Sequence, residues 1–207
     1  MFIIDCNRSS LPRFLEGILV NLFDAILTRR TIKEFTDQPV PDDLLHQALD
    51  AGRWAQNHRM TEPWRFLILG PQSRQAIAAI NGDAVLEKAR ADAGMLAKMR
   101  TDAEAKILSK PRIVAVTCCL CGNKEVEQED YAAVSCAVQN IQLAAWGLGL
   151  GMQWTTSGFT TWPDTYALLG VDPAQEMIAG LLYFGFPAAV PDPKPRKSLA
   201  EVTRTLP

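Results

Sequence analysis

Residues 127–150 read EQEDYAAVSCAVQNIQLAAWGLGL, and this stretch decides the fold. Its apolar part, residues 131–150, approaches the length of about 20 residues that a membrane-spanning helix needs. However, serine, glutamine and asparagine interrupt it at four positions, and four acidic residues lie just upstream. We therefore interpret residues 127–148 as a long helix buried in a soluble protein, and we expect no contact with a membrane.

Three strand-like segments surround this helix in the sequence. Residues 113–120 are rich in β-branched side chains and predict a central strand. Residues 65–69 form a short apolar run bounded by proline and glycine, which predicts a buried strand, and residues 177–184 predict another. Strands and helices therefore mix without a strict βαβ repeat.

Two shorter helices are predicted before the first strand. Asn21 is a suitable N-cap for a helix whose apolar residues fall on one face and which should end near Arg29 and Arg30. Pro41 suits the first position of a second helix, because a first-turn residue needs no intrahelical N–H bond. This second helix should run to about Ala55.

The remaining segments are less regular. A third helix is expected from about Gln72, and residues 83–109 form a weakly amphipathic helical segment that we interpret as a mobile cover. Residues 187–197 carry proline at nearly every second position, so they should be extended and could reach about 30 Å, onto a partner subunit. Residues 1–20 show no period and are assigned to an N-terminal extension.

Length and charge limit the classes of protein that the chain can represent. The 207 residues fit one domain, which we assign to residues 21–207. The net charge of −2 argues against the basic surface that nucleic acid binding requires. The first residues lack a basic segment and a long apolar run, so no signal peptide is expected.

The five cysteines form an odd set, and three of them fall within residues 118–121, which is a poor disulfide framework. They suit the reducing cytoplasm, where we expect the protein to be located. With only His46 and His58 elsewhere, the cysteines lack the ligand spacing of a zinc site. We therefore expect no metal, and we interpret these cysteines as strand residues that pack as small hydrophobic side chains.

Known catalytic motifs are missing from the sequence. It contains no Gly-x-Gly-x-x-Gly after a strand, no Walker loop and no Gly-x-Ser-x-Gly elbow. What remains is a set of basic and small polar residues at loop positions. This pattern is typical of a protein that positions a cofactor, which then performs the chemistry.

Five blocks of sequence, in a fixed order, carry a resemblance to a known family. They are RRTIKEF at 29–35 with AGRWA at 51–55, NHRMTEPWRF at 57–66, residues 140–149 with WTTSG at 154–158, residues 181–187, and RKSL at 196–199. Together they resemble the nitroreductase family over about residues 21–205. Glu62 replaces the glutamine that this family usually has before Pro-Trp.

The resemblance implies an α+β, three-layer fold in which a mostly antiparallel sheet is flanked by helices. It also implies a homodimer built on the long helix, with C-terminal tails exchanged between subunits and FMN bound at the subunit interface. NADH or NADPH would deliver hydride to flavin N5, and a nitro compound, quinone or similar small acceptor would then take the electrons. No catalytic side chain is expected, because the flavin carries the hydride.

The resemblance assigns the first block to the flavin phosphate. Arg29 and Arg30 would contact the phosphate together with the Thr31 hydroxyl, since a guanidinium can bind phosphate with two parallel hydrogen bonds. The alternative is that both arginines only complement the C-terminus of the preceding helix. Lys33 would point at the N1/O2 edge of the flavin, where reduction places negative charge; its alternative is a solvated lysine.

The later blocks supply the other predicted contacts. Trp54 and His58 would lie near the flavin ring or phosphate, although a lone histidine is often only structural. The loop that begins at Trp154 would face the flavin, and Thr155 and Thr156 would lie under the ring. The remaining predicted phosphate contacts are Arg196 and Lys197, whose alternative is a solvated, charged tail.

Two other functions remain open at this point. A relative of the same fold could use its flavin to dehalogenate a substrate or to oxidise and fragment it, and residues 83–109 would decide this. A flavin-binding protein with little turnover is the third possibility.

Overall fold

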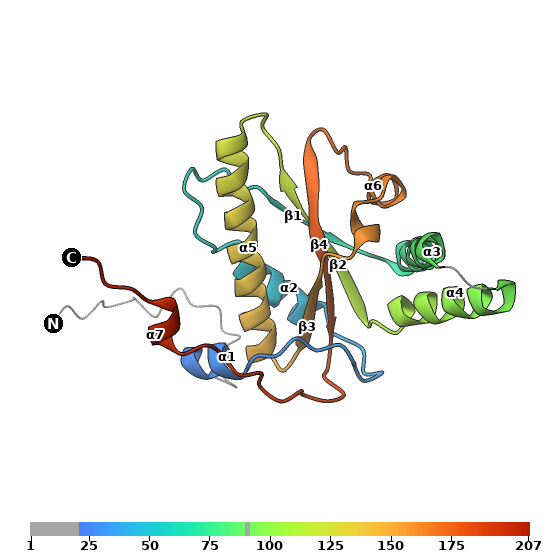
Figure 1. Ribbon diagram of the computed structural model, residues 1–207, viewed down its shortest axis with the longest axis horizontal. Helices are drawn as coiled ribbons and strands as arrows, with labels where there is room; N and C mark the ends of the chain where they lie inside the picture. The colour runs from blue at the N-terminus through green and yellow to red at the C-terminus, as the bar shows by residue number, and fades with distance from the viewer. Residues whose placement is uncertain (1–20, 90–91) are drawn as a thin grey trace.

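The protein is described by a computed structural model over residues 21–89 and 92–207, so the extension assigned to residues 1–20 and Cys6 lie outside the described residues. A four-stranded antiparallel sheet forms its centre (Figure 1). The strands are β1 (Trp64–Ile68), β2 (Arg112–Cys119), β3 (Gly151–Thr155) and β4 (Glu176–Gly185), in the spatial order β1-β2-β4-β3. The predicted strands are confirmed, and β3 is an additional edge strand.

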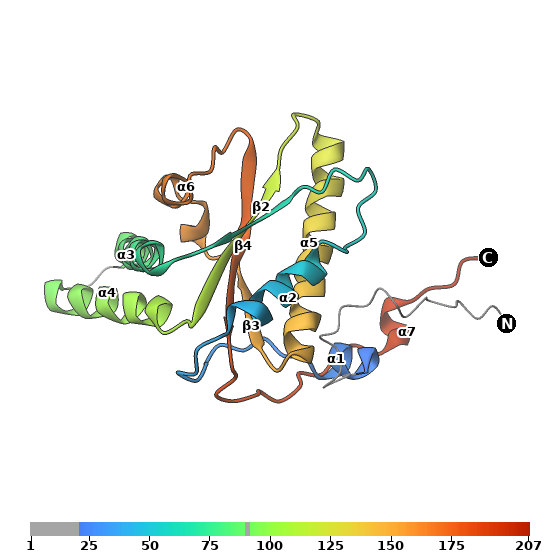
Figure 2. The same cartoon turned by 180° about the vertical axis from the view of Figure 1, so that it is seen from behind.

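Helices cover both faces of the sheet, which gives three layers (Figures 1 and 2). One face carries α2 (Asp42–Gly52) and α5 (Lys124–Gly147). The opposite face carries α3 (Pro71–Lys88), α4 (Ala93–Leu108), η3 (Gly158–Thr161) and α6 (Pro163–Leu169). The predicted α+β class with a mainly antiparallel sheet is therefore confirmed.

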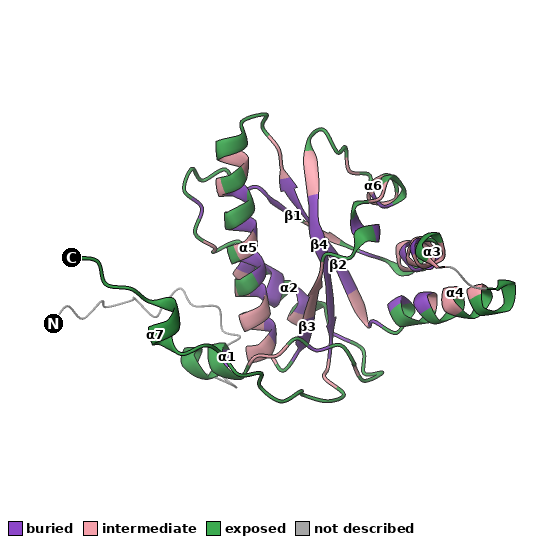
Figure 3. Ribbon diagram, in the orientation of Figure 1, coloured by how far each residue is buried: buried purple, intermediate pink, exposed green. Residues whose placement is uncertain are grey.

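The long helix α5 begins three residues before its predicted start. The Asn123 side chain caps its N-terminus by accepting from the N–H groups of Glu125 and Val126. Its inner face is fully buried against the sheet and α2, whereas Tyr131 and Cys136 on the opposite face are exposed (Figure 3). The prediction of a buried helix thus holds for one face only.

Helix α2 packs closely on α5. A Cβ atom at Gly52 would lie 2.8 Å from two side-chain carbons of Ile141, so a glycine is needed for this approach. Pro41 is the N-cap rather than the first helical residue, and the helix ends at Gly52 instead of Ala55. Both predicted ends were therefore wrong by a few residues.

Residues 83–109 do not form the single helical segment that was predicted, because they divide between the end of α3 and α4, which pack against each other; their role as a mobile cover stays a prediction. The Asn81 amide donates to the Ala103 carbonyl at 2.9 Å, and Arg100 forms an ion pair with Asp83 at 2.8 Å. Asp92 caps α4 with its carboxylate. This cap and the cross-helix contacts explain why the segment divides into two helices.

The two ends of the described chain lie together beside the body. Helix α1 (Leu22–Thr28) has the predicted N-cap, since the Asn21 side chain accepts from the Phe23 N–H at 2.8 Å. Its apolar face is not buried, because Leu22, Phe23 and Leu27 are 63–70% exposed. The tail beyond Pro187 is exposed and has no regular structure before the short helix α7 (Leu199–Val202), so it is not helical over the proline-rich residues, as predicted (Figure 3).

The cysteines behave mainly as predicted. Cys118 is buried and Cys119 half-buried within β2, whereas Cys121 lies exposed beyond the strand. Within residues 21–89 and 92–207, no three histidine, cysteine or acidic side chains are grouped as metal ligands. No helix in the same ranges is long and apolar enough to span a membrane.

Candidate cofactor site

The segment that follows α1 forms one wall of a cleft of about 790 Å³. The Ile32 N–H donates to the Met152 carbonyl at 3.1 Å, which attaches the segment to the edge of β3. Ile32 is fully buried, with its side chain packed over Gly151. Because successive side chains of an extended chain point in opposite directions, Thr31 and Lys33 face outward and line the cleft.

The C-terminal tail forms the other wall of this cleft. Two main-chain hydrogen bonds hold it beside the first wall, from Thr36 N–H to the Phe186 carbonyl at 2.9 Å and from Ala188 N–H to the Glu34 carbonyl at 3.1 Å. The proline-rich chain beyond them stays extended and brings Arg196 to the cleft. Lys197, the next residue, is exposed outside the lining.

The cleft concentrates arginines that have no acidic partners. The pKa of Arg29 is lowered by burial of its guanidinium and, next, by the positive charges of Arg196 and Arg30. Glu34 and Asp192 also line the cleft, but neither forms an ion pair with an arginine within the described part of the chain. Like charges gathered in this way favour an anionic ligand.

Arg29 and Arg30 play different roles. One Arg30 nitrogen donates to the carbonyls of Leu27 and Arg29, each at 2.9 Å, so Arg30 closes the C-terminus of α1. Its Nε atom is buried and has no hydrogen-bond partner. Arg29 instead donates to the Gln142 side chain on α5 at 3.0 Å. The helix-complementing alternative therefore describes Arg30 and not Arg29.

A second, smaller cleft of about 390 Å³ lies between the α3–α4 pair and the sheet. Thr155 and Ser157 line it, and their hydroxyls lie 2.7 Å apart. Tyr183 and Lys110 also line it, and burial raises the pKa of the Tyr183 phenol. Sequence reasoning missed Lys110, because a lone lysine before a strand gives no signal of burial.

The predicted residues of the β3 region separate into two groups. The Trp154 indole donates to the Ala179 carbonyl at 3.1 Å and lies over Gly180, where a Cβ would come within 2.5 Å of its nitrogen. Trp154 is therefore held against the core. Thr155 points the other way into the second cleft, and Thr156 is exposed directly after the strand.

Trp54 and His58 do not line the arginine cleft; they lie in the loop of residues 53–63. Trp54 is 79% exposed and His58 is also exposed. The same loop contains Met60 and Glu62 with positive φ angles of 50° and 45°, a backbone conformation that costs about 1–2 kcal/mol for most residues. The loop thus presents an exposed aromatic side chain on a strained backbone.

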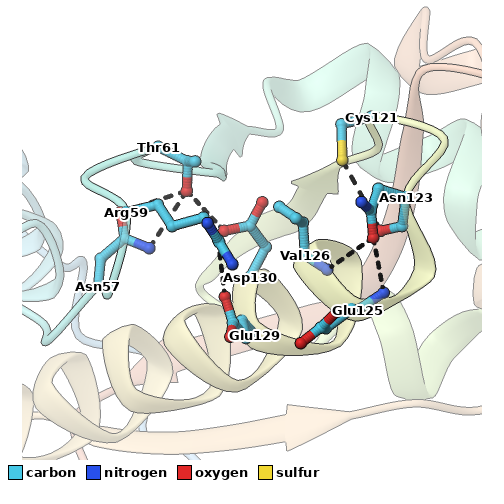
Figure 4. Close-up of polar contacts among 9 residues, drawn as sticks. All are labelled: Asn57, Arg59, Thr61, Cys121, Asn123, Glu125, Val126, Glu129 and Asp130. Atoms are coloured by element: carbon cyan, nitrogen blue, oxygen red, sulfur yellow. Dashed lines mark hydrogen bonds and ion pairs between the residues drawn. The ribbon is translucent and has the colours of Figure 1, made fainter.

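A partly buried polar network holds this loop against the start of α5 (Figure 4). The Thr61 hydroxyl donates to buried Asp130 at 2.5 Å, and the Asn57 amide donates to Thr61 at 3.2 Å. The Asn57 carbonyl oxygen in turn accepts from the Glu62 N–H at 2.8 Å. An ion pair between Arg59 and Glu129 at 3.0 Å lies on the outside of the network.

The loop of residues 53–63 and the arginine cleft are both attached to α5, and the loop starts from Gly52 beside Ile141. The loop binds at Asp130, and Arg29 binds at Gln142. Twelve residues of helix separate these positions, or about 18 Å at a rise of 1.5 Å per residue. In one chain the structure brings together Arg29, Arg30, Thr31, Lys33 and Arg196, but not Trp54 or His58.

Comparison with known proteins identifies the family. The model of the nitroreductase family matches residues 26–186, most of the chain. The chain belongs to the nitroreductase family. The family suggested by the five sequence blocks is thus confirmed, and its members are oxidoreductases.

Relatives of this nitroreductase-family chain match it over nearly its whole length. The Bacillus subtilis protein named "Putative NAD(P)H nitroreductase YfhC" is 28% identical over 180 residues, covering 87% of this chain and 91% of its own. The crystal structure of a nitroreductase-like family protein from Bacillus cereus has a TM-score of 0.78 at 28% identity, covering 91% of this chain and 97% of its own.

One solved relative contains a flavin. The crystal structure of a Desulfovibrio desulfuricans protein, described as a "putative nitroreductase in complex with FMN", has a TM-score of 0.67 at 25% identity. It covers 91% of this chain and 98% of its own.

Proposed function

We propose that this protein is an FMN-dependent oxidoreductase that transfers hydride from NAD(P)H to a small acceptor such as a nitro compound or a quinone. The observation that carries the proposal is the arginine cleft, where Arg29, Arg30 and Arg196, which form no ion pair within the described residues, share the lining with Thr31. This donor set fits a flavin phosphate, which offers several acceptor oxygens and up to two negative charges. The buried, unpartnered Nε of Arg30 is a further donor available to it.

The chain's own residues would divide the binding work. Arg29, Thr31 and Arg196 hold the phosphate by charge-assisted hydrogen bonds, and Arg30 adds positive charge while closing α1. Lys33, which lines the arginine cleft, would place its ammonium near the flavin ring, and Thr155 and Thr156 are the other residues proposed to contact the ring. Bound FMN would supply the hydride chemistry, which none of these side chains can perform alone.

The same proposal includes a homodimer in which one FMN contacts two subunits. Trp54 and His58 do not line the arginine cleft of their own chain, so in this proposal they would serve the partner's flavin. The exposed apolar face of α1 and the exposed tail provide surface for such a partner. Exchange of the tails between subunits belongs to this proposal.

A visible spectrum of the purified protein tests the cofactor. We expect the absorption of a bound flavin, release of FMN on denaturation, and bleaching when NADH or NADPH is added. A colourless protein that takes up neither FMN nor riboflavin would refute the proposal. If the flavin is bound but NADH and NADPH never bleach it, the protein binds flavin without reductase activity.

Subunit mixing tests the shared site. Arg29→Ala subunits and Trp54→Ala/His58→Ala subunits should each bind FMN weakly. When the two are unfolded and refolded together, the mixed dimers should regain one site of full affinity, because each contributes the half that the other lacks. A mixture that binds no better than its components would show that each chain holds its flavin alone.

A further inference from the structure

Lys110 is a buried lysine outside the predicted site. It follows α4, is only 5% exposed, and forms no ion pair within the described ranges. Burial lowers its pKa, the Lys106 charge lowers it further, and Glu34 opposes the shift. Because burying an ammonium costs free energy, a lysine at this position needs an explanation that a methionine would not.

The contacts of Lys110 lead to the cofactor cleft. Its Nζ donates to the main-chain carbonyl of Lys33 at 2.7 Å. It also lies 5.4 Å from the centre of the Phe35 ring, within the range of a cation–π contact. Lys110 therefore lines the second cleft and, through Lys33, supports the segment that forms one wall of the arginine cleft.

The importance of this contact depends on which other hydrogen bonds hold residues 32–36. The neighbouring main-chain bonds are from Ile32 N–H to Met152, from Ala188 N–H to the Glu34 carbonyl and from Thr36 N–H to Phe186. Lys110 supplies the bond at the Lys33 carbonyl, between Ile32 and Glu34. Without it, the Lys33 carbonyl would lose its donor, and the peptide unit after Lys33 would be held less firmly.

We propose that Lys110 is a positioning residue, whose ammonium fixes the main chain at Lys33 and so sets the Lys33 side chain in the cofactor cleft. The part that concerns flavin rests on the proposed function. The mechanical part does not, because it concerns only the chain's own contacts. The two parts can therefore be tested separately.

Hydrogen exchange of the flavin-free protein tests the mechanical part. Lys110→Met keeps an unbranched side chain that is one atom shorter and removes its charge, and Lys98→Met, an exposed position on α4, is the matched control. We expect the amides of Ile32 and Thr36 to exchange about 10-fold faster in Lys110→Met, the effect of losing one charge-assisted hydrogen bond. Exchange equal to that of the control would overturn the proposal.

The reduction potential of the bound flavin tests the second part. Lys110→Met should lower the midpoint potential in the same direction as Lys33→Met, but by less. In the Lys33→Met background it should cause no further shift, because its action passes through Lys33. Additive shifts would show that Lys110 acts on the flavin independently and would overturn a role through Lys33.

Two outcomes need separate measurements. If the protein binds no FMN at all, the proposed function fails, and the exchange experiment still decides the mechanical role of Lys110. If Lys110→Met does not fold, the ammonium signal of Lys110 in the NMR spectrum of the wild-type protein replaces it. A slowly exchanging signal that shifts on FMN addition supports the proposal, and a signal that exchanges like that of Lys98 overturns it.

Discussion

The two ends of α5 carry opposite kinds of polar structure. At its C-terminal end, Arg29 lies in a cleft whose cations lack acidic partners. At its N-terminal end, Asp130 closes a network in which each side chain has a partner. Binding of an anion would stabilise the first arrangement. The second already has its hydrogen bonds formed, and it holds an exposed loop. In the proposed shared site, unpaired positive charge therefore marks the half that would bind the phosphate, the arginine cleft, which we call the receiving half. The loop of residues 53–63, whose strained backbone is held by hydrogen bonds, is the presenting half.

The largest effect should come from removing a cation of the receiving half. Arg29→Ala should weaken FMN binding about 10-fold to 100-fold, because a hydrogen bond between charged groups contributes about 1.5–3 kcal/mol. Titration of FMN by fluorescence measures this, with the exposed Arg53→Ala as a control. Riboflavin, which lacks the phosphate, should bind both proteins equally; an equal loss for riboflavin would contradict the assignment of Arg29.

The network of the presenting half should show the next effect. Thr61→Val leaves the buried Asp130 without its hydroxyl donor and should lower the free energy of unfolding by about 1–3 kcal/mol. Urea unfolding provides the measurement. Ser135→Ala removes a hydroxyl that only donates within α5, so it should change stability far less. Equal losses would mean that the network adds nothing beyond one hydroxyl.

The strain in the loop can be relieved directly. Met60→Gly should raise the free energy of unfolding by about 0.5–1 kcal/mol, because glycine adopts a positive φ without steric cost. Met95→Gly, in the right-handed backbone of α4, should lower it by a similar amount. If Met60→Gly also weakened FMN binding, the strained conformation would be part of how the loop presents Trp54.

The smallest effect concerns one thiol next to the network. Burial, and secondarily the Asp130 charge, raises the pKa of Cys118 from 9.0 to about 12. The unfolded chain therefore releases this proton first, so stability is lost as the pH rises above 9. Cys118→Ala should show a shallower loss between pH 9 and 12 in pH-dependent unfolding, and an unchanged slope would contradict the shift.

Local patterns predicted those parts of the fold that local chemistry controls. The cap at Asn21, the strand β2 and most of α5 follow from side chains near in sequence. Helix α6 was missed although Pro163 and the left-handed Gly170 mark its two ends. Strand β3 was missed because its five residues are defined by pairing with β4 and not by their own pattern.

The site was predictable only as far as its sequence blocks reach. Arg29, Thr31 and Lys33 were found by resemblance, and the structure shows that they line one cleft with Arg196. The different tasks of Arg29 and Arg30 depend on where each guanidinium finds a carbonyl or an amide, which spacing does not reveal. Lys110 meets Lys33 across 77 residues, so no local pattern could indicate that contact.

In the proposed shared site, α5 would act as the spacer between Asp130, which holds the loop of residues 53–63, and Gln142, which binds Arg29. Each residue inserted between Asp130 and Gln142 would move one half by about 1.5 Å and turn it by about 100° relative to the other. In a symmetric dimer that error would enter both flavin sites at once. The connection between α3 and α4 belongs to neither half, so lengthening it should not change the relative position of the two halves. Insertions and deletions should therefore be tolerated least within α5.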